Sequence, residues 1–235
     1  MRDEKKKRLV IIPAYNEEGA ILKTVRDIEA KAGSFDYVVI NDCSKDHTRQ
    51  ILEENGLNHV NLPMNSGIGA AVQTGYIYAA ENGYEMAIQV DGDGQHDAAF
   101  LERMAEILEE SDANMVIGSR FIKNEGFQST GLRRMGIRFF TWWIKRLTGE
   151  VVTDPTSGMR LADRKVIELF AKDYPRDYPE PETAVTVLKA GYKIKEIPVE
   201  MRARESGKSS SSMKKSIYYM IKVPLACLVA AVATD

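Results

Sequence analysis

A short acidic segment in the middle of the chain carries side chains that could bind a metal ion. It reads Asp-Gly-Asp-Gly-Gln-His-Asp over residues 91–97, so Asp91 and Asp93 are one residue apart and Gln95 follows. Glycines permit a sharp loop in which several oxygens converge on one cation. Such oxygen ligands suit Mg²⁺ or Mn²⁺, which then bridges phosphate oxygens. The segment therefore predicts a divalent-cation site for a phosphorylated ligand.

A calcium loop or a plain acidic turn are the alternatives for this segment. Asp-x-Asp-Gly also begins an EF-hand loop, and Glu102 falls in the register of its twelfth position. However, an apolar strand pattern precedes the segment, where an EF-hand would have a helix. We therefore favour the metal-phosphate interpretation.

Gly67 and Gly69 form a second segment of interest, at the start of a helical pattern. A dinucleotide-binding fingerprint would add a third glycine and a later acidic residue, and the sequence has neither at the expected place. Hydride transfer is therefore disfavoured. Two interpretations stay open: a nucleotide approaches the backbone closely at Gly69, or the glycines let the helix pack tightly on a sheet.

These segments follow strands in a regular alternation of strand and helix patterns. We predict strands at 9–12, 37–41, 60–62, 86–90 and 115–118, and helices at 18–31, 46–54, 67–82, 98–110, 163–171 and 181–190. This alternation is typical of an α/β fold with a mostly parallel sheet, in which ligands bind at the carboxyl ends of the strands. Asp46 and Asp97 stand where helix N-caps are expected. Polar or glycine-rich segments at 13–18, 41–46, 65–70 and 91–97 should therefore share one edge.

Composition limits the classes of protein. The chain has 235 residues and a net charge of -2, which favours one large domain and gives no overall attraction to nucleic acid. Its two cysteines, Cys43 and Cys227, are too few for a secreted disulfide framework, so we expect a reducing cytoplasm. The apolar run at 9–12 is too short for a signal peptide. The run at 223–233 is also shorter than the about 20 residues that cross a bilayer.

The order of the motifs resembles the family 2 glycosyltransferases, in the branch of dolichyl-phosphate mannose synthase and bacterial polyprenyl-phosphate glycosyltransferases. The resemblance covers residues 8 to about 212 and rests on Val-Ile-Ile-Pro-Ala-Tyr-Asn-Glu-Glu, Asn-Asp-Cys-Ser, the acidic segment, Gly-Ser-Arg at 118–120, and Asp154 with Ser-Gly-Met-Arg at 157–160. It implies a GT-A type fold. We expect a catalytic domain at 1–212, with a donor half at about 1–120 and an acceptor half at about 121–212, and a C-terminal amphipathic helix at 213–235.

The resemblance also implies roles for individual residues. Asp42 would meet the nucleotide base and Glu17 the ribose, although Asn41 and Cys43 replace the usual neighbours of that carboxylate and leave the base preference open. The nucleotide-binding residues implied in this way are Pro13, Ala14, Tyr15, Glu17, Asp42, Gly69 and Asp91. The implied metal ligands are Asp91, Asp93 and Gln95. The implied catalytic residues are Asp93, Arg120 and Glu182. Glu182 matches the carboxylate that faces the acceptor, or it is an acidic residue favoured at a helix N-terminus.

Basic residues in the second half suggest a phosphate acceptor. A phosphomonoester is already largely ionised at neutral pH, so it needs cations more than a general base. The candidate ligands of the acceptor phosphate are Arg120, Arg133, Arg134, Arg160, Arg202, Arg204 and Lys208. Arginine suits this role through bidentate contacts, although we expect about half of these cations to be solvated surface charges.

Two segments have the pattern of helices that lie on a membrane. Within 132–147, one helical face carries basic residues and the other carries aromatic residues, as an interfacial helix requires. A second apolar stripe comprises Ile217, Ile221, Leu225, Leu228 and Val232. Burial in the protein core is the alternative for both.

Together these features predict inverting, Mg²⁺- or Mn²⁺-dependent transfer of a sugar from a UDP- or GDP-linked donor to a polyprenyl phosphate at the cytoplasmic membrane face. The expected partners are the nucleotide sugar, the polyprenyl phosphate, the membrane surface and a small membrane protein, without nucleic acid. The first alternative is a soluble family 2 enzyme that glycosylates a sugar hydroxyl in capsule or cell-wall polysaccharide. The second is a non-catalytic nucleotide-binding or membrane-docking module.

Overall fold

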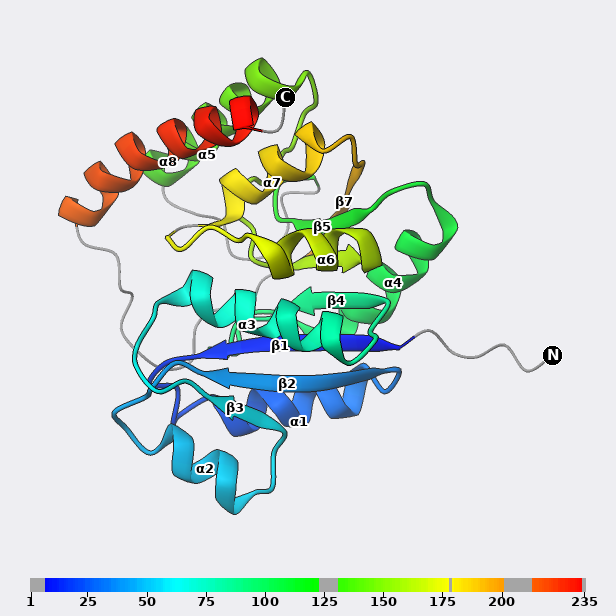
Figure 1. Ribbon diagram of the computed structural model, residues 1–235, viewed down its shortest axis with the longest axis vertical. Helices are drawn as coiled ribbons and strands as arrows, with labels where there is room; N and C mark the ends of the chain where they lie inside the picture. The colour runs from blue at the N-terminus through cyan, green and yellow to red at the C-terminus, as the bar shows by residue number, and fades with distance from the viewer. Residues whose placement is uncertain (1–6, 123–130, 178, 201–212, 234–235) are drawn as a thin grey trace.

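One mixed sheet organises the whole chain (Figure 1). The computed structural model describes residues 7–122, 131–177, 179–200 and 213–233, with residues 131–133, 213–217 and 233 described by their backbone alone. The seven strands follow the order β3-β2-β1-β4-β6-β5-β7. Their bounds are β1 Arg8–Ala14, β2 Phe35–Asn41, β3 His59–Asn61, β4 Met86–Gln89, β5 Met115–Ser119, β6 Arg160–Asp163 and β7 Ile194–Pro198.

Helices connect the strands and cover both faces of the sheet. Their bounds are α1 Ile21–Lys31, α2 Thr48–Glu54, α3 Ile68–Glu81, the 3₁₀ helix η1 Ala98–Phe100, α4 Leu101–Glu110, α5 Gly131–Thr148, α6 Arg164–Lys172, α7 Pro179–Lys189 and α8 Met213–Ala233. The predicted strands and helices of the first half are confirmed to within a few residues. Asp97 caps η1 as expected, by accepting a hydrogen bond from the N–H of Ala99.

Strand pairing confirms the mostly parallel sheet and adds one strand of opposite direction. β1 pairs in parallel with β2 and β4, β2 with β3, and β5 with β7. β6 lies between β4 and β5 and is antiparallel to both. Strands β6 and β7 were not predicted from the sequence. β6 has only four residues, and β7 carries Lys195 and Glu196 in its middle, so neither shows a clear apolar run.

Two apolar cores lie on opposite faces of the sheet. One comprises residues of α1, α2 and α4 packed on the sheet, and the other comprises residues of α3 and α5 to α8. Val223, Cys227 and Ala231 of α8 belong to the second core, so one face of this helix is buried against the protein. Burial raises the pKa of the Cys227 thiol to about 12, which keeps it protonated.

Helix α8 is fixed to α5 and to the loop before α7 by polar contacts. Trp143 of α5 donates a hydrogen bond from Nε1 to the carbonyl oxygen of Pro224 at 3.1 Å. Lys222 forms an ion pair with Asp177. Within the described ranges, no helix is long and apolar enough to cross a membrane.

The approach of α3 to β1 depends on a residue without a side chain, which gives a test of the packing. A Cβ on Gly75 would lie 2.2 Å from Cγ2 of Ile11, a fully buried residue. We expect Gly75→Ala to lower the free energy of unfolding by about 1–3 kcal/mol, because the two elements would have to separate. Urea unfolding measures the change. Gly33→Ala is the control, since nothing lies within 4 Å of its added Cβ; an equal loss in both variants would contradict the packing argument.

Candidate functional site

The direction of the strands determines which residues form a common edge. All strands of the described sheet except β6 run the same way, so their carboxyl ends lie together with the amino end of β6. This edge therefore brings together two groups of segments. The first comprises the loops at 15–20, 42–47, 62–67 and 90–97, and the second comprises residues 120–122 and 154–159. The antiparallel strand thus brings part of the second half of the chain to the edge that was predicted for the first.

The loops after β1 and β2 hold each other through reciprocal hydrogen bonds. The N–H of Asn16 donates to Oγ of Ser44 at 3.0 Å, and the N–H of Lys45 donates to Oδ1 of Asn16 at 2.7 Å. Asn16 and Cys43 both adopt a φ of 57°, in the left-handed region that few residues other than glycine occupy. These contacts fix the backbone shape of the predicted nucleotide-binding loops.

Asp46 strengthens the same contact between loops. Its carboxylate accepts hydrogen bonds from the N–H groups of Glu18 and Thr48 at 3.1 and 3.0 Å. Burial acts to raise the pKa of Asp46, but the bonds from Thr48 and Glu18 outweigh it and lower the pKa overall. His47, rather than the predicted Asp46, is the residue that directly precedes α2.

Four members of the predicted nucleotide-binding set lie on or just after β1. Pro13 and Ala14 are buried, whereas Tyr15 is 41% exposed and Glu17 is half-buried. The N–H of Glu17 donates to Oγ1 of Thr48 at 2.9 Å. Of these four residues, Tyr15 and Glu17 are therefore the two that reach solvent.

Asp42 and Gly69 have different surroundings from those expected of ligand-binding residues. Asp42 is only 3% exposed, and its two carboxylate oxygens accept the N–H groups of Ser66 and Gly67 at 2.7 and 2.9 Å. In this structure Asp42 holds the loop before α3, and a bond to a base would compete with these contacts.

Gly69, which was predicted to bind the nucleotide, lies against the backbone of residues 175 and 176. Its N–H donates to the carbonyl oxygen of Arg176, and an added Cβ would lie 2.1 Å from the carbonyl oxygen of Pro175. Backbone of the 175–176 loop thus covers this glycine. Of the two interpretations left open by the sequence, tight packing is the one that the contacts support.

The Asp91–Asp97 segment forms a compact loop at the end of β4. Oδ1 of Asp93 accepts the N–H of Gln95 at 3.0 Å, and Gly94 makes the turn with a φ of 76°. The Asp91 side chain is 39% exposed, and its Oδ1 accepts a hydrogen bond from Nε2 of Gln89 at 3.1 Å. His96 is buried beside it and accepts the N–H of Asp91 at Nδ1, at 3.1 Å.

The donor atoms of this loop fit a hard divalent cation. Asp91 and Asp93 supply carboxylate oxygens, and Gln95 supplies an amide oxygen. Among the residues that the structure describes, no three His, Cys, Asp or Glu side chains come together in a way that could hold a metal ion by themselves. A Mg²⁺ ion typically has only a few protein ligands, and water and substrate phosphates complete its coordination shell.

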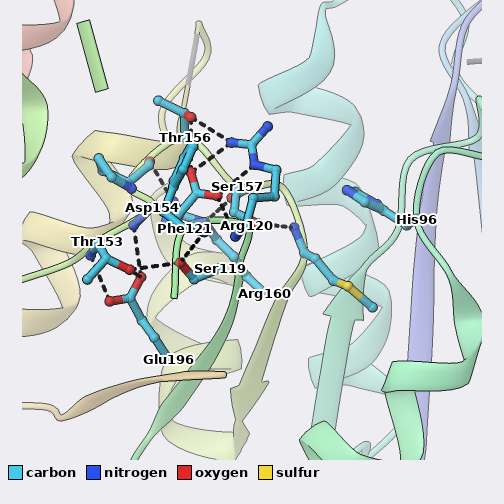
Figure 2. Close-up of polar contacts among 12 residues, drawn as sticks. His96, Ser119, Arg120, Phe121, Thr153, Asp154, Thr156, Ser157, Arg160 and Glu196 are labelled. Atoms are coloured by element: carbon cyan, nitrogen blue, oxygen red, sulfur yellow. Dashed lines mark hydrogen bonds and ion pairs between the residues drawn. The ribbon is translucent and has the colours of Figure 1, made fainter. Parts of the chain in front are cut away.

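Arg120, a predicted catalytic residue and phosphate ligand, is held in a buried ion pair. Nε and an Nη of Arg120 bond the two carboxylate oxygens of Asp154 at 2.6 and 2.7 Å (Figure 2). Asp154 is fully buried and Arg120 is 8% exposed. The same Nη also donates to Oγ1 of Thr156 at 2.9 Å. These contacts make Arg120 a residue that joins the end of β5 to the 154–156 loop.

Glu196 of β7 extends this network, and sequence reasoning missed it. Its carboxylate accepts the N–H groups of Thr153 and Asp154 at 2.7 and 2.9 Å, and the hydroxyl of Thr153 at 3.0 Å. Because the Thr153 hydroxyl donates to Glu196, Ser119 must be the donor in the 2.7 Å contact between the two hydroxyls. A glutamate within an otherwise strand-like run, Ile-Lys-Glu-Ile-Pro, was the available signal.

Arg160, another predicted phosphate ligand, is likewise surrounded by protein acceptors. It is 2% exposed. Its guanidinium donates to the carbonyl oxygens of Pro155, Ser157 and Glu180 and to Oγ1 of Thr183. With its donors directed at the protein, Arg160 fixes the start of α7 against the amino end of β6.

Two carboxylates near the start of α7 have different surroundings. Burial raises the pKa of Glu180, with Arg160 opposing the rise and Asp91 adding to it. Burial also raises the pKa of Glu182, but the charges around it belong to Asp173 and Lys222. Glu180, rather than the predicted Glu182, therefore shares its electrostatic environment with the Asp91 loop.

The remaining predicted phosphate ligands are outside this cluster or outside the described structure. Arg134 is exposed on α5. The side chain of Arg133 and the whole of Arg202, Arg204 and Lys208 lie outside the described residues.

Comparison with known proteins adds a family and a fold. The chain matches the model of Glycosyl transferase family 2 over residues 9–170. An uncharacterized protein of Methanocaldococcus jannaschii is 31% identical over 197 residues, which cover 81% of this chain and 79% of that protein. A polyprenol monophosphomannose synthase of Mycolicibacterium smegmatis is 27% identical over 225 residues, which cover 92% and 84%.

A solved structure shows the same arrangement of helices and strands. Glucosyl-3-phosphoglycerate synthase from Mycobacterium tuberculosis, in complex with Mn²⁺, UDP-glucose and phosphoglyceric acid, has a TM-score of 0.74 at 19% identity. The likeness covers 97% of this chain and 80% of that chain. It shows the shared fold, which is the GT-A type expected from the sequence.

The Glu196 network predicts a pH effect on stability. Burial raises the pKa of Glu196, while the bonds from Thr153 and Asp154 oppose the rise. A raised pKa means that its contribution to folding is fully present below the ordinary pKa and is lost as the pH rises through the folded value. Relative to Glu196→Gln, the wild-type protein should therefore lose free energy of unfolding as the pH rises above the ordinary glutamate pKa of about 4.3.

Urea unfolding of both proteins across that pH range measures the difference. Glu110→Gln, at an exposed glutamate that ends α4, is the matched control and should give a difference that varies little with pH. A difference for Glu196→Gln that stays constant or grows with pH would contradict the effect of burial.

Proposed function

We propose that this chain, which belongs to glycosyl transferase family 2, transfers a sugar from a UDP- or GDP-linked donor to a polyprenyl phosphate at the cytoplasmic membrane face. The observation that carries the proposal is the position of the Asp91–Asp97 loop. It lies at the end of β4, between the interlocked loops after β1 and β2 and the 154–159 segment. A phosphorylated donor would thus meet oxygen ligands on one side and the second half of the chain on the other.

The donor site is proposed to comprise the first four strand ends. Tyr15 and Glu17 would contact the nucleoside, since their residues reach solvent at this edge. Asp42 would act by fixing the 66–67 backbone, or would exchange that contact for the base. Asp91, Asp93 and Gln95 would hold Mg²⁺ or Mn²⁺, and the bound cation would stabilise negative charge on the departing nucleoside diphosphate.

The reaction is proposed to be a single displacement with inversion. A phosphate oxygen of the acceptor would form the bond to the anomeric carbon as the bond to the donor diphosphate breaks. A phosphate at neutral pH already carries this nucleophilic oxygen, so no side chain need take a proton from it. Glu180 and Glu182 remain the candidates for a general base if the acceptor is a hydroxyl instead.

The acceptor is proposed to be a lipid because of the surface that α5 and α8 form together (Figure 1). The outer side of α8 exposes Tyr218, Ile221, Leu225, Leu228, Val229 and Val232, at 41 to 67%. The sequences of α5 and α8 contain no Asp or Glu, and Arg134, Arg138, Lys145 and Arg146 of α5 are exposed. A basic and apolar surface of this kind suits the headgroup region of an anionic membrane.

The name of one relative supports the same acceptor class. The mycobacterial relative is named a polyprenol monophosphomannose synthase and matches this chain over most of its length. The solved structure of similar fold instead contains phosphoglyceric acid, and it supports only the fold. We therefore favour the lipid phosphate, with a sugar hydroxyl as the alternative outcome of the test.

A transfer assay tests the proposed reaction. The chain would be incubated with radiolabelled UDP- and GDP-sugars, a short polyprenyl phosphate and Mn²⁺, followed by solvent extraction. We expect label in the lipid phase with at least one donor, and its loss when Mn²⁺ is replaced by excess chelator. Label on an added oligosaccharide but not on the lipid would favour the hydroxyl alternative, and lipid labelling that persists in chelator would contradict the metal assignment.

Vesicle flotation tests the proposed membrane surface. Ile221→Glu with Leu225→Glu places two charges on the exposed side of α8, and we expect at least about a tenfold loss of binding to phosphatidylglycerol vesicles. Ile77→Glu with Val151→Glu is the matched control, because these residues are exposed apolar positions on other parts of the chain. Equal loss in both double variants would contradict a specific α5–α8 surface, and capture by a small membrane protein without vesicle binding would assign the surface to that partner.

A further inference from the structure

The exposed Asp91 carboxylate rests on two buried polar side chains that the transfer mechanism has not used. Gln89 and His96 are 2% and 5% exposed, in contrast to the 39% exposure of the Asp91 side chain. We propose that Gln89 and His96 are positioning residues that fix the Asp91 carboxylate for a divalent cation. The inference rests on the proposed function, because it takes Asp91 as a metal ligand.

Gln89 connects Asp91 to the middle of the sheet. It is the last residue of β4 and pairs with Arg160 of the antiparallel strand β6. From this position its Nε2 donates to Oδ1 of Asp91 at 3.1 Å. Because β4 pairs with β1 on one side and β6 on the other, the bond ties one carboxylate oxygen to a strand that is held from both sides.

His96 holds the other side of the same residue. Its Nδ1 accepts the backbone N–H of Asp91 at 3.1 Å, so the proton of the neutral ring lies on Nε2. That Nε2 faces Oδ2 of Asp91 at 4.0 Å, which is beyond a direct hydrogen bond. The ring therefore fixes the backbone of Asp91 and directs an N–H toward its second oxygen.

Gly158 closes the arrangement from the side of the second half. A Cβ at this position would lie 3.4 Å from Oδ2 of Asp91, Nε2 of Gln89 and Cε1 of His96. The backbone of the Ser-Gly-Met segment thus packs directly on all three side chains. An ionised carboxylate offers about four lone-pair positions, so Asp91 can accept the inward donors and still bind a cation with the outward ones.

The chemical consequence is a preorganised ligand. Residues that orient a metal ligand typically change metal affinity by about 10–100-fold when they are substituted. We expect the same of Gln89 and His96, with most of the effect on metal affinity and little on the binding of nucleotide alone. A purely structural role would change both, or neither.

The test measures Mn²⁺ affinity directly, by the electron paramagnetic resonance signal of free Mn²⁺ in the presence of UDP or GDP. His96→Asn keeps an acceptor near the Nδ1 position but removes the Nε2 proton, and Gln89→Met removes the donor at similar size. His59→Asn is the matched control, at a half-buried histidine at the start of the edge strand β3. Circular dichroism establishes that each variant is folded, and calorimetry in excess chelator measures nucleotide binding without metal.

We expect His96→Asn and Gln89→Met to raise the Kd for Mn²⁺ by about tenfold or more, with His59→Asn unchanged and chelator-resistant nucleotide binding retained. Values within about twofold of the wild type in the folded variants would overturn the inference. An equal loss of nucleotide binding in chelator would also overturn it. If the wild-type protein itself binds no Mn²⁺ with either nucleotide, the metal assignment of the proposed function fails first.

Discussion

The buried ion pair between Arg120 and Asp154 is the interaction on which the architecture of the site depends. It joins the end of β5 to the segment that leads into β6, and Glu196 of β7 binds the backbone of the same segment. Removing one partner of a buried pair leaves an uncompensated charge, which typically destabilises by about 3–5 kcal/mol. Here the pair also holds the loop that ends in Gly158, so the Asp91 carboxylate depends on it indirectly. The geometry of the site therefore depends on this arginine.

The first half of the fold could be read from the sequence because its signals are local. Strands β1, β2, β4 and β5 each contain a buried apolar run, and helices α1 and α4 have a clear amphipathic period. The acidic loop after β4 could be placed for the same reason, because its strand is unambiguous. β6 and β7 could not, since their pairing with distant strands and not their composition makes them strands.

The individual roles of charged residues were harder to predict. Arg120 and Arg160 have the residue type and the motif position of phosphate ligands, but both guanidinium groups donate hydrogen bonds to buried protein acceptors. A sequence shows that a guanidinium is present and does not show whether an Asp or a carbonyl oxygen lies within reach. Gln89 and His96 were left out of the predicted site, because a single polar residue in or near an apolar strand gave no reason to connect it with Asp91. Glu180 and Glu182 are only two residues apart in the sequence. Because both lie in helix α7, their side chains leave the helix on different sides and have different surroundings.

The loop at 175–177 links the two halves of the proposed enzyme over a very short distance. Arg176 accepts the N–H of Gly69 at the start of α3, and the next residue, Asp177, binds Lys222 of α8. Adjacent Cα atoms are about 3.8 Å apart. If α8 lies on a membrane as proposed, these two adjacent residues would connect the membrane-facing helix directly to the start of α3, which belongs to the same edge of the sheet as the proposed donor site.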